Sequence, residues 1–185
     1  MTTIIIHLIR HAEAVQRVPG GVDEFRYLTC RGRSRFRRVT ATLKKLGIDP
    51  DFIVASPKVR AIQTAEILAE GIRFRGEVVV APQLADDFRL VGLRDVLINF
   101  PSAQEIVFVG HEPDLGHLTT ELLCLSGAAT IKKGGVISLL VTLKHGSHSS
   151  EFVRLITGGG KVVEKRDKGI ERLLVVREKA EEEGA

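Results

Sequence analysis

Two histidines and two arginines stand where apolar, strand-like runs end or where a helix is expected to begin, the usual places for catalytic residues in α/β proteins. These residues are Arg10, His11, Arg60 and His111. A neutral imidazole is a good nucleophile toward phosphorus when one ring nitrogen is unprotonated. Arginine keeps its charge and holds anionic oxygens with paired N–H donors. Together these residue types predict a site for one phosphoryl group.

The chemistry that these residues favour is transfer of the phosphoryl group to a histidine. The group carries negative charge on its oxygens during transfer, so catalysis is mostly positioning and charge stabilisation. Arg10 and Arg60 would hold the oxygens, and His111 would add a third positive group when protonated. N–H groups at the starts of the helices expected at Ser56 and Pro113 would add partial positive charge. Because these cations belong to the protein, we expect no metal and no cofactor.

The spacing of apolar residues predicts the elements that position this site. Short apolar runs predict strands at residues 3–10, 52–55, 78–81, 105–109, 136–143 and 152–157. Three- and four-residue steps predict helices at residues 31–46, 57–70, 90–98, 113–125 and 170–183. Strands that alternate with helices favour an α/β fold of three layers, α/β/α. Its central sheet is expected to be mainly parallel, with an antiparallel part from the late strands.

Local signals predict where several of these elements begin and end. Gly47 and Gly71 are expected to end the first two helices, because glycine readily adopts the left-handed conformation that follows a helix. Ser56 is expected to be the N-cap of the second helix, with Pro57 at its first position. Residues 145–150 are expected to form a hairpin loop between two strands.

The composition predicts an ordinary globular protein. The 185 residues are 44% hydrophobic and 27% charged, and we expect one domain at 1–185, with a core at about 3–157 and a C-terminal extension at 158–185. No run approaches the roughly 20 apolar residues of a membrane span, and the N-terminus lacks the basic region of a signal peptide. Cys30 and Cys124 show no CxxC spacing, which is typical of reduced thiols. We therefore expect a cytoplasmic location and no membrane partner.

Positive charge is concentrated early in the chain. The formal net charge is +4, and residues 25–48 contain eight Arg and Lys residues and no acid. This stretch is either a solvated helix face or a patch that steers an anionic partner. An anion-binding or nucleic-acid-binding protein is a further alternative. It is disfavoured because only Tyr27 and Phe36 could stack on bases and no binding motif is present.

Several short motifs together resemble a known family. In chain order they are Leu8-Ile9-Arg10-His11, Leu28-Thr29 with Gly32, Ser56-Pro57, Arg60-Ala61, Gln63-Thr64-Ala65 and Gly110-His111. In this order and at these spacings they resemble the histidine phosphatase superfamily, which has the phosphoglycerate mutase-like fold, over about residues 4–143. The resemblance implies that His11 becomes phosphorylated and that Arg10, Arg60 and His111 complete the phosphate pocket.

Within that superfamily the chain is similar to the short, SixA-type phosphohistidine phosphatases. Its first motif continues as Ala12-Glu13-Ala14, its last motif continues as Glu112-Pro113-Asp114-Leu115, and long insertions that would cover a small sugar phosphate are absent. The resemblance implies that the substrate is phosphohistidine on a signalling protein or a histidine phosphotransfer-type protein. A small phosphate ester is the alternative within the same fold. The basic first helix and the extension at 158–185 depart from this branch.

The general acid has several candidates. Larger members of the family place a carboxylate after the strand that follows the second helix, where this chain has Asp86 and Asp87. Either carboxylate could protonate a leaving group, or both could simply cap the next helix. Glu13 is a further candidate for lining the pocket. We therefore take Glu13 and Asp86 as candidate substrate-binding residues beside the two arginines.

Other polar residues of the motifs are expected to be structural. Ser56 lacks the GxSxG surroundings of a nucleophilic serine, and Gln63 and Thr64 are expected to pack or to cover the helix surface. The histidines do not form the HExxH pattern of zinc enzymes, so no metal site is expected.

Overall fold

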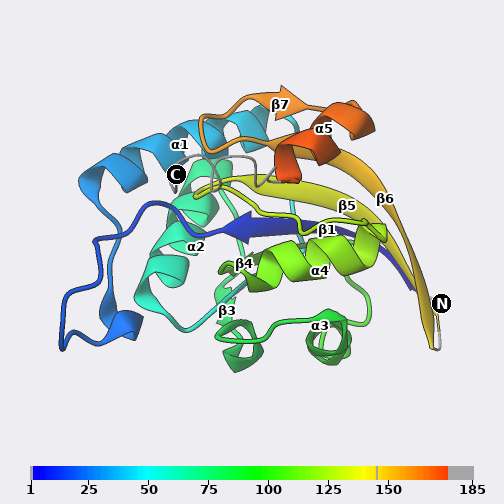
Figure 1. The fold of residues 1–185 in the computed structure, drawn as a ribbon, viewed down its shortest axis with the longest axis horizontal. Helices are drawn as coiled ribbons and strands as arrows, with labels where there is room; N and C mark the ends of the chain where they lie inside the picture. The colour runs from blue at the N-terminus through cyan, green and yellow to red at the C-terminus, as the bar shows by residue number, and fades with distance from the viewer. Residues whose placement is uncertain (1, 145, 175–185) are drawn as a thin grey trace, which may run out of the picture.

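A seven-stranded sheet with helices on both faces is the framework of the protein in the computed structural model, which describes residues 2–144 and 146–174 (Figure 1). The strands are β1 (Thr2–Arg10), β2 (Phe52–Ala55), β3 (Val78–Val80), β4 (Glu105–Gly110), β5 (Val136–Lys144), β6 (Ser147–Ile156) and β7 (Val162–Val163). The helices are α1 (Cys30–Lys45), α2 (Val59–Ile72), α3 (Leu90–Leu97), α4 (Asp114–Leu123) and α5 (Arg166–Leu173), with short 3-10 turns η1 (Asp23–Phe25) and η2 (Pro82–Leu84).

The order of the strands is β3-β2-β4-β1-β5-β6-β7. Strands β3, β2, β4 and β1 are mutually parallel, whereas β5, β6 and β7 each run antiparallel to the strand before them in this order. This arrangement confirms the predicted three-layer α/β fold. Its parallel half brings the carboxyl ends of β2, β4 and β1 to one edge of the sheet, where ligands bind in open α/β sheets.

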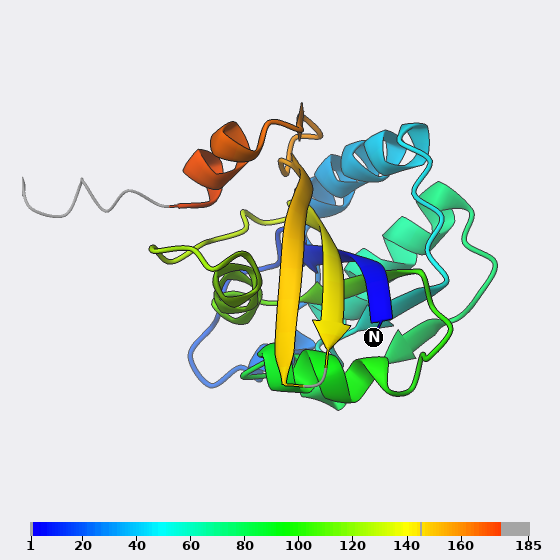
Figure 2. The same cartoon turned by 90° about the vertical axis from the view of Figure 1, so that its right-hand side faces the viewer.

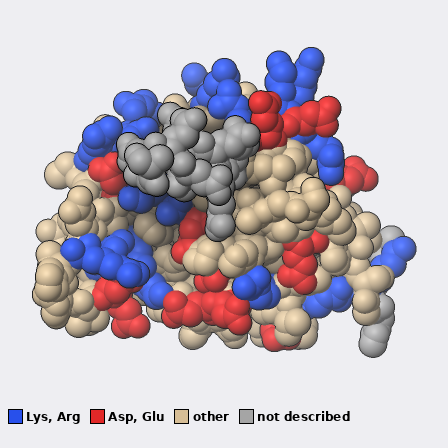
Figure 3. Space-filling view, in the orientation of Figure 1, with Lys and Arg blue, Asp and Glu red and all other residues tan. Residues whose placement is uncertain are grey.

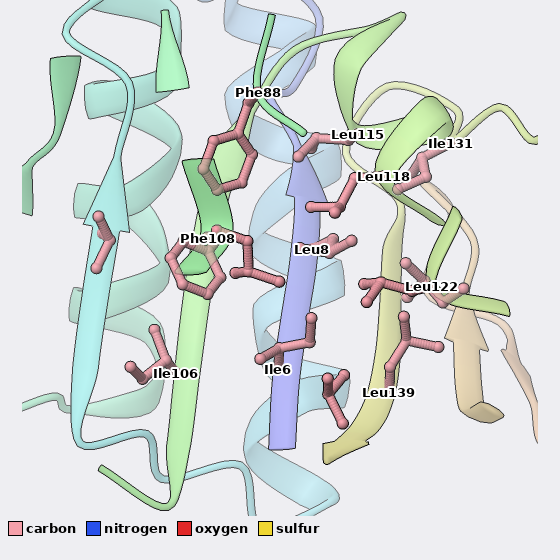
Figure 4. Packing of buried hydrophobic residues seen from close by; sticks show 14 of the residues in the cluster. Ile6, Leu8, Phe88, Ile106, Phe108, Leu115, Leu118, Leu122, Ile131 and Leu139 are labelled. Atoms are coloured by element: carbon pink, nitrogen blue, oxygen red, sulfur yellow. The ribbon is translucent and has the colours of Figure 1, made fainter. Parts of the chain in front are cut away.

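Apolar side chains alternate between the two faces of β1, as the pleat of a strand requires. Ile6 and Leu8 join the cluster that packs beneath α3, α4 and α5, whereas Ile9 joins the cluster beneath α1 and α2. Figure 2 shows α1 and α2 on one side of the sheet and α4 on the other. Figure 4 shows Leu8 among Phe108, Leu115 and other residues of the first cluster. With β1 buried on both faces, its carboxyl end is held rigidly.

The predicted start and end of the second helix are wrong. The helix begins at Val59 rather than at Pro57, because the Ser56 hydroxyl is occupied by the N–H of Lys58 and by His111 instead of capping a first turn. The helix also continues through Gly71 to Ile72. A side chain at Gly71 would collide with Thr40 of α1, so this glycine allows two helices to pack closely instead of ending one of them.

The predicted loop at 145–150 is too long. Strand β6 begins at Ser147 and pairs with β5 from that residue onward, and His145 lies outside the described residues. Polar residues can form this part of β6 because β7 pairs with only Leu155 and Ile156, which leaves residues 147–154 at an edge of the sheet. An exposed strand of this kind does not carry the apolar pattern by which strands are recognised.

The last helix is also displaced from its prediction. Helix α5 begins at Arg166 and ends at Leu173, and Leu174 forms a bridge with Ala129 instead of continuing the helix. Leu173 is buried in the first apolar cluster, which ties α5 to the sheet. The predicted continuation over residues 175–183 lies outside the described part of the chain. None of the described helices has the length and apolar character needed to cross a bilayer.

Candidate active site

The register of β1 against β4 places the two predicted histidines side by side. Arg10 pairs with Gly110, and each of these residues is followed directly by a histidine. The rings of His11 and His111 lie 5.2 Å apart between centroids and are inclined by 54°. Each residue is only 6% exposed. The pairing of β1 with β4 thus brings residues one hundred positions apart together at the carboxyl ends of these strands.

Hydrogen bonds on both sides of the His11 ring determine which nitrogen carries the proton. Its Nδ1 lies 2.7 Å from the carbonyl oxygen of Ala12, which can only accept a hydrogen bond, so Nδ1 carries the proton. The Nε–H of Arg60 points at His11 Nε2 from 3.3 Å. Burial lowers the pKa of His11 to about 3; the Ala12 carbonyl opposes this shift, and Arg60 and Arg10 add to it. His11 therefore presents an unprotonated Nε2, as a nucleophile must.

Arg60 is held in place by a residue that sequence reasoning missed. It lies in the first turn of α2, and its Nη1 and Nη2 donate to the carbonyl and to Oδ2 of Asp23 at 2.7 and 2.8 Å. Arg17 and Arg26 approach Oδ1 of the same carboxylate to 2.8 and 3.3 Å. Partial burial pushes the pKa of Asp23 upward, but hydrogen bonds from Arg60 and Arg17 outweigh it and hold the pKa below its ordinary value. A carboxylate thus lies among three guanidinium groups beside His11.

Arg10 is held from the opposite side of the site. Its Nη1 donates to the carbonyl oxygen of Ile131 at 2.9 Å, and the N–H of Ile131 in turn donates to Glu112 at 2.8 Å. Burial raises the pKa of Glu112 and lowers that of Arg10, while their mutual attraction opposes both shifts. The Nε of Arg10 is buried and has no hydrogen-bond partner among the described residues. A buried donor of this kind is available to an anionic ligand.

His111 would add positive charge only when protonated, and its surroundings disfavour the protonated form. Burial lowers the pKa of His111 to about 2, and the neighbouring His11, Arg60 and Lys58 add to the shift. The residue is therefore neutral at pH 7 rather than a third positive group. Its Nε2 lies 2.7 Å from the hydroxyl of Ser56, which follows β2. Ser56 thus orients His111, a role that its position before a helix did not reveal.

Two residues of the Gln63-Thr64-Ala65 motif also support the site. Thr64, fully buried on α2, accepts a hydrogen bond from the N–H of Ala12 and donates one to the carbonyl of Arg60. Gln63 accepts a hydrogen bond from the N–H of Leu28. The expectation that both residues only pack or cover the helix surface is wrong, because they fasten α2 to the segments on either side of the site.

The three candidate carboxylates are bound to residues other than the histidines. Asp86 is bound to Lys58 at 2.8 Å and Asp87 to Arg89 at 3.0 Å, and both side chains are 83% exposed. Neither caps α3, whose first turn has no side-chain cap, so the capping interpretation is wrong as well. Glu13 accepts a hydrogen bond from the hydroxyl of Thr29. The structure thus brings together Arg10, His11, Arg60 and His111, but it gives Asp86 and Glu13 other partners.

A basic cavity of about 790 Å³ lies beside Arg10. Its cationic lining consists of Arg10, Arg35, Lys132, Lys133, Lys161 and Arg172. Its only acidic lining residues in the described part of the chain are Glu13 and Glu171, so the cavity is strongly positive. Lys and Arg side chains gather along the upper edge of the molecule in Figure 3, over α1 and α5. Over residues 2–144 and 146–174, no group of three potential metal ligands is found.

Comparison with known sequences finds one family and several relatives. The sequence model of the histidine phosphatase superfamily (branch 1) matches residues 6–113. An uncharacterised protein of Picosynechococcus sp. (strain ATCC 27264 / PCC 7002 / PR-6) is 32% identical over 144 residues, which cover 72% of this chain and 83% of the relative. The mitochondrial serine/threonine-protein phosphatase Pgam5 of Drosophila yakuba is 41% identical over 75 residues, 40% of this chain but only 25% of the relative.

Solved structures share the fold at low sequence identity. The protein histidine phosphatase SixA, complexed with tungstate, matches with a TM-score of 0.71 and 22% identity over 84% of this chain and 97% of its own. A mycobacterial glucosyl-3-phosphoglycerate phosphatase matches with a TM-score of 0.60 and 18% identity over 82% of this chain and 97% of its own. The same framework therefore occurs in proteins that are named for a protein substrate and for a small-molecule substrate.

Proposed function

The chain belongs to branch 1 of the histidine phosphatase superfamily, and from that premise we propose that it is a metal-independent phosphatase that acts through a phosphorylated His11. The membership confirms the resemblance inferred from the motifs. The observation that carries the proposal is the state of His11, whose Nδ1 donates its proton to the Ala12 carbonyl and whose unprotonated Nε2 accepts a hydrogen bond from Arg60. The preferred substrate in this proposal is phosphohistidine on a signalling or phosphotransfer protein.

In the first step, His11 Nε2 attacks the phosphorus atom, and the bond from phosphorus to the substrate breaks. Arg10 and Arg60 stabilise the charge on the phosphoryl oxygens. A substrate imidazole that keeps the proton on its other nitrogen leaves as a neutral ring, so this step needs no general acid. The carboxylates of Asp86 and Asp87 are paired with Lys58 and Arg89, which fits a reaction that does not need them.

In the second step, water attacks phosphorus and the bond to His11 Nε2 breaks. Both protons of the water leave with the phosphate, and the His11 ring becomes neutral again with its proton still on Nδ1. The hydrogen bond from Nδ1 to Ala12 can persist through both steps, so the ring does not need to rotate. Fixed orientation of the nucleophile is an advantage that preorganised sites exploit.

A small-molecule phosphomonoesterase is the second candidate function. It is favoured by the fold shared with the glucosyl-3-phosphoglycerate phosphatase and by the basic cavity beside Arg10, which is large enough for a small organic phosphate. An alkoxide is a poorer leaving group than a neutral imidazole, so this activity requires a proton donor. The two carboxylates that the sequence suggests as proton donors, Asp86 and Asp87, are instead paired with Lys58 and Arg89.

A substrate panel tests the function. Wild type and His11→Ala are assayed for phosphate release from free phosphohistidine, phosphoserine and p-nitrophenyl phosphate, each with and without EDTA. We expect phosphohistidine to be the best substrate, EDTA to have no effect and His11→Ala to be inactive on all three. Preference for an ester would favour the second candidate, and turnover by His11→Ala or loss of activity in EDTA would refute the mechanism.

A further inference from the structure

Exposed apolar side chains are concentrated in the segment that leads from β1 to α1. Four of the seven large hydrophobic side chains exposed in the described part of the chain lie between residues 18 and 27. They are Val18, Val22, Phe25 and Tyr27, each between 55% and 69% exposed, and we call them the 18–27 face. Single exposed apolar residues are normal, but a concentration beside a site indicates an interaction surface.

The 18–27 face is fixed to the active site by its own polar residues. Asp23, at the centre of the segment, is bound by Arg60 of the site and by Arg17 and Arg26 of the segment. At the end of the segment, the N–H of Leu28 is bound by Gln63 of α2. The exposed apolar side chains therefore belong to the same segment as Asp23, which binds the arginine that contacts His11.

The size of the segment's own cavity indicates what kind of ligand could cover this face. A cavity of about 290 Å³ is lined by Arg17, Val18, Gly21, Val22, Asp23 and Arg26. Phe25 and Tyr27 are not part of this lining, so a small ligand confined to the cavity would leave both rings in water. Covering them requires a partner with a broader surface. Arg17 and Arg26 outnumber Asp23 in this lining, so its net charge is +1, which suits the approach of a phosphoryl group.

We propose that the 18–27 face is the docking surface for a phosphoprotein, whose phosphorylated histidine stands between apolar side chains. This inference rests on the proposed function and specifies the substrate: apolar neighbours pack on Phe25 and Tyr27 while the phosphoryl group reaches His11. Burial of apolar area supplies the affinity, and the arginines select the charged group. The recognition is separate from the chemistry, so it affects KM and leaves kcat unchanged.

Two synthetic peptides test this inference. They carry the same phosphohistidine, flanked by leucines in one and by serines in the other, and free phosphohistidine serves as the reference substrate. For wild type we expect kcat/KM to be about tenfold higher for the leucine peptide, equivalent to about 1.4 kcal/mol. In Phe25→Ser/Tyr27→Ser this preference should disappear through a higher KM, while turnover of free phosphohistidine is unchanged and shows that the variant is folded.

The matched control is Val91→Ser/Ile98→Ser, which removes two apolar side chains, in α3 and directly after it, that are at least as exposed as Phe25 and Tyr27. It should keep the preference for the leucine peptide. The inference is overturned if wild type hydrolyses both peptides with equal kcat/KM, if Phe25→Ser/Tyr27→Ser retains the preference, or if the control loses it. In those cases the proposed function stands. If neither peptide nor free phosphohistidine is hydrolysed, the proposed function and this inference both fail.

Discussion

At the scale of the residue, the decisive property of His11 is the position of its proton. A carbonyl on one side and a guanidinium N–H on the other leave Nε2 unprotonated, and burial keeps the ring neutral. The sequence could predict that His11 lies at a strand end beside an arginine. It could not predict the tautomer, because Ala12 contributes through its backbone carbonyl, which any residue at this position would offer.

The buried neutral histidines predict how stability depends on pH. In His11 and His111 the folded-state pKa, about 3 and about 2, lies below the ordinary value of 6.5, so the unfolded chain binds more protons in acid. The contribution of these neutral rings to the free energy of unfolding is complete above pH 6.5. It is lost as the pH falls toward the folded-state pKa of each ring, by up to about 1.4 kcal/mol per pH unit for each ring. Urea unfolding at pH 7 and pH 5 should show a larger loss for wild type than for His11→Asn/His111→Asn. Equal losses would contradict the neutral, buried state.

Asp23 is the residue whose role is hardest to read from sequence and easiest to test. Its carboxylate shares Arg60 with the phosphoryl group that the mechanism places on His11. Removal of this negative charge in Asp23→Asn should tighten the binding of inorganic phosphate roughly threefold to tenfold, as expected for loss of about 1 kcal/mol of repulsion. Calorimetric titration measures it, with Asp86→Asn as the control for an exposed carboxylate. Weaker binding by Asp23→Asn would show instead that Asp23 is needed to position Arg60.

Sequence reasoning missed Asp23, Arg17 and Arg26 for a physical reason. They lie in a connecting segment without helical or strand periodicity, so nothing local indicates which way their side chains point. Asp23 and Arg26 are brought together by the 3-10 turn η1, and Asp23 meets Arg60 only because the segment packs against α2. Ser56 was noticed but given the wrong role, since a serine before a proline is a common helix start and its contact with His111 depends on the pairing of β2 with β4.

At the scale of the element, the buried strands were the most predictable parts of the fold. Strand β2 matches its predicted range, and β1 and β4 differ by one residue at a single end, because both faces of these strands are covered and their residues are mostly apolar. The predicted ends of helices and strands were wrong where tertiary contacts decide where the element begins or ends. Strand β6 is polar at an edge of the sheet, and α5 ends at Leu173, where Leu174 pairs with Ala129.

The first turn of α1 predicts a strong effect of a small substitution. A side chain at Gly32 would collide with the carbonyl oxygen of Glu13, two residues after His11. We expect Gly32→Ala to lower the free energy of unfolding by about 1–3 kcal/mol through overpacking. Gly159→Ala is the control, because a methyl group there meets only the Thr157 hydroxyl at 3.8 Å. Urea unfolding measures both, and equal stabilities would show that α1 does not constrain the segment after His11.

At the scale of the whole molecule, positive charge is gathered at the edge of the sheet where the site lies. The charge excess of residues 25–48 could be predicted from the sequence. Its partners in space could not, because they come from the segment before β5, the turn after β6 and helix α5; they are Lys132, Lys133, Lys161 and Arg172. The structure thus joins separate stretches of sequence into one basic cavity next to Arg10.

This arrangement predicts a marked salt dependence. Exposed positive charges attract anionic substrates from a distance. Salt screens this attraction beyond about 8 Å at physiological ionic strength. We expect kcat/KM for p-nitrophenyl phosphate to fall severalfold between 50 mM and 500 mM NaCl, while kcat changes little. Lys132→Ser/Lys133→Ser should weaken this dependence, whereas Lys44→Ser/Lys45→Ser at the far end of α1 should not. A kcat/KM that is independent of salt would mean that the basic cavity beside Arg10 does not attract the substrate.

The measurement that bears most directly on the account is the identification of the phosphorylated residue during turnover. Wild type is mixed rapidly with phosphohistidine, quenched in alkali to preserve phosphorus–nitrogen bonds, digested and mapped by mass spectrometry. The account predicts one phosphoryl group on His11, absent from His11→Ala and lost at the rate at which inorganic phosphate appears. A phosphoryl group on another residue, or turnover without any phosphorylated enzyme, would contradict it.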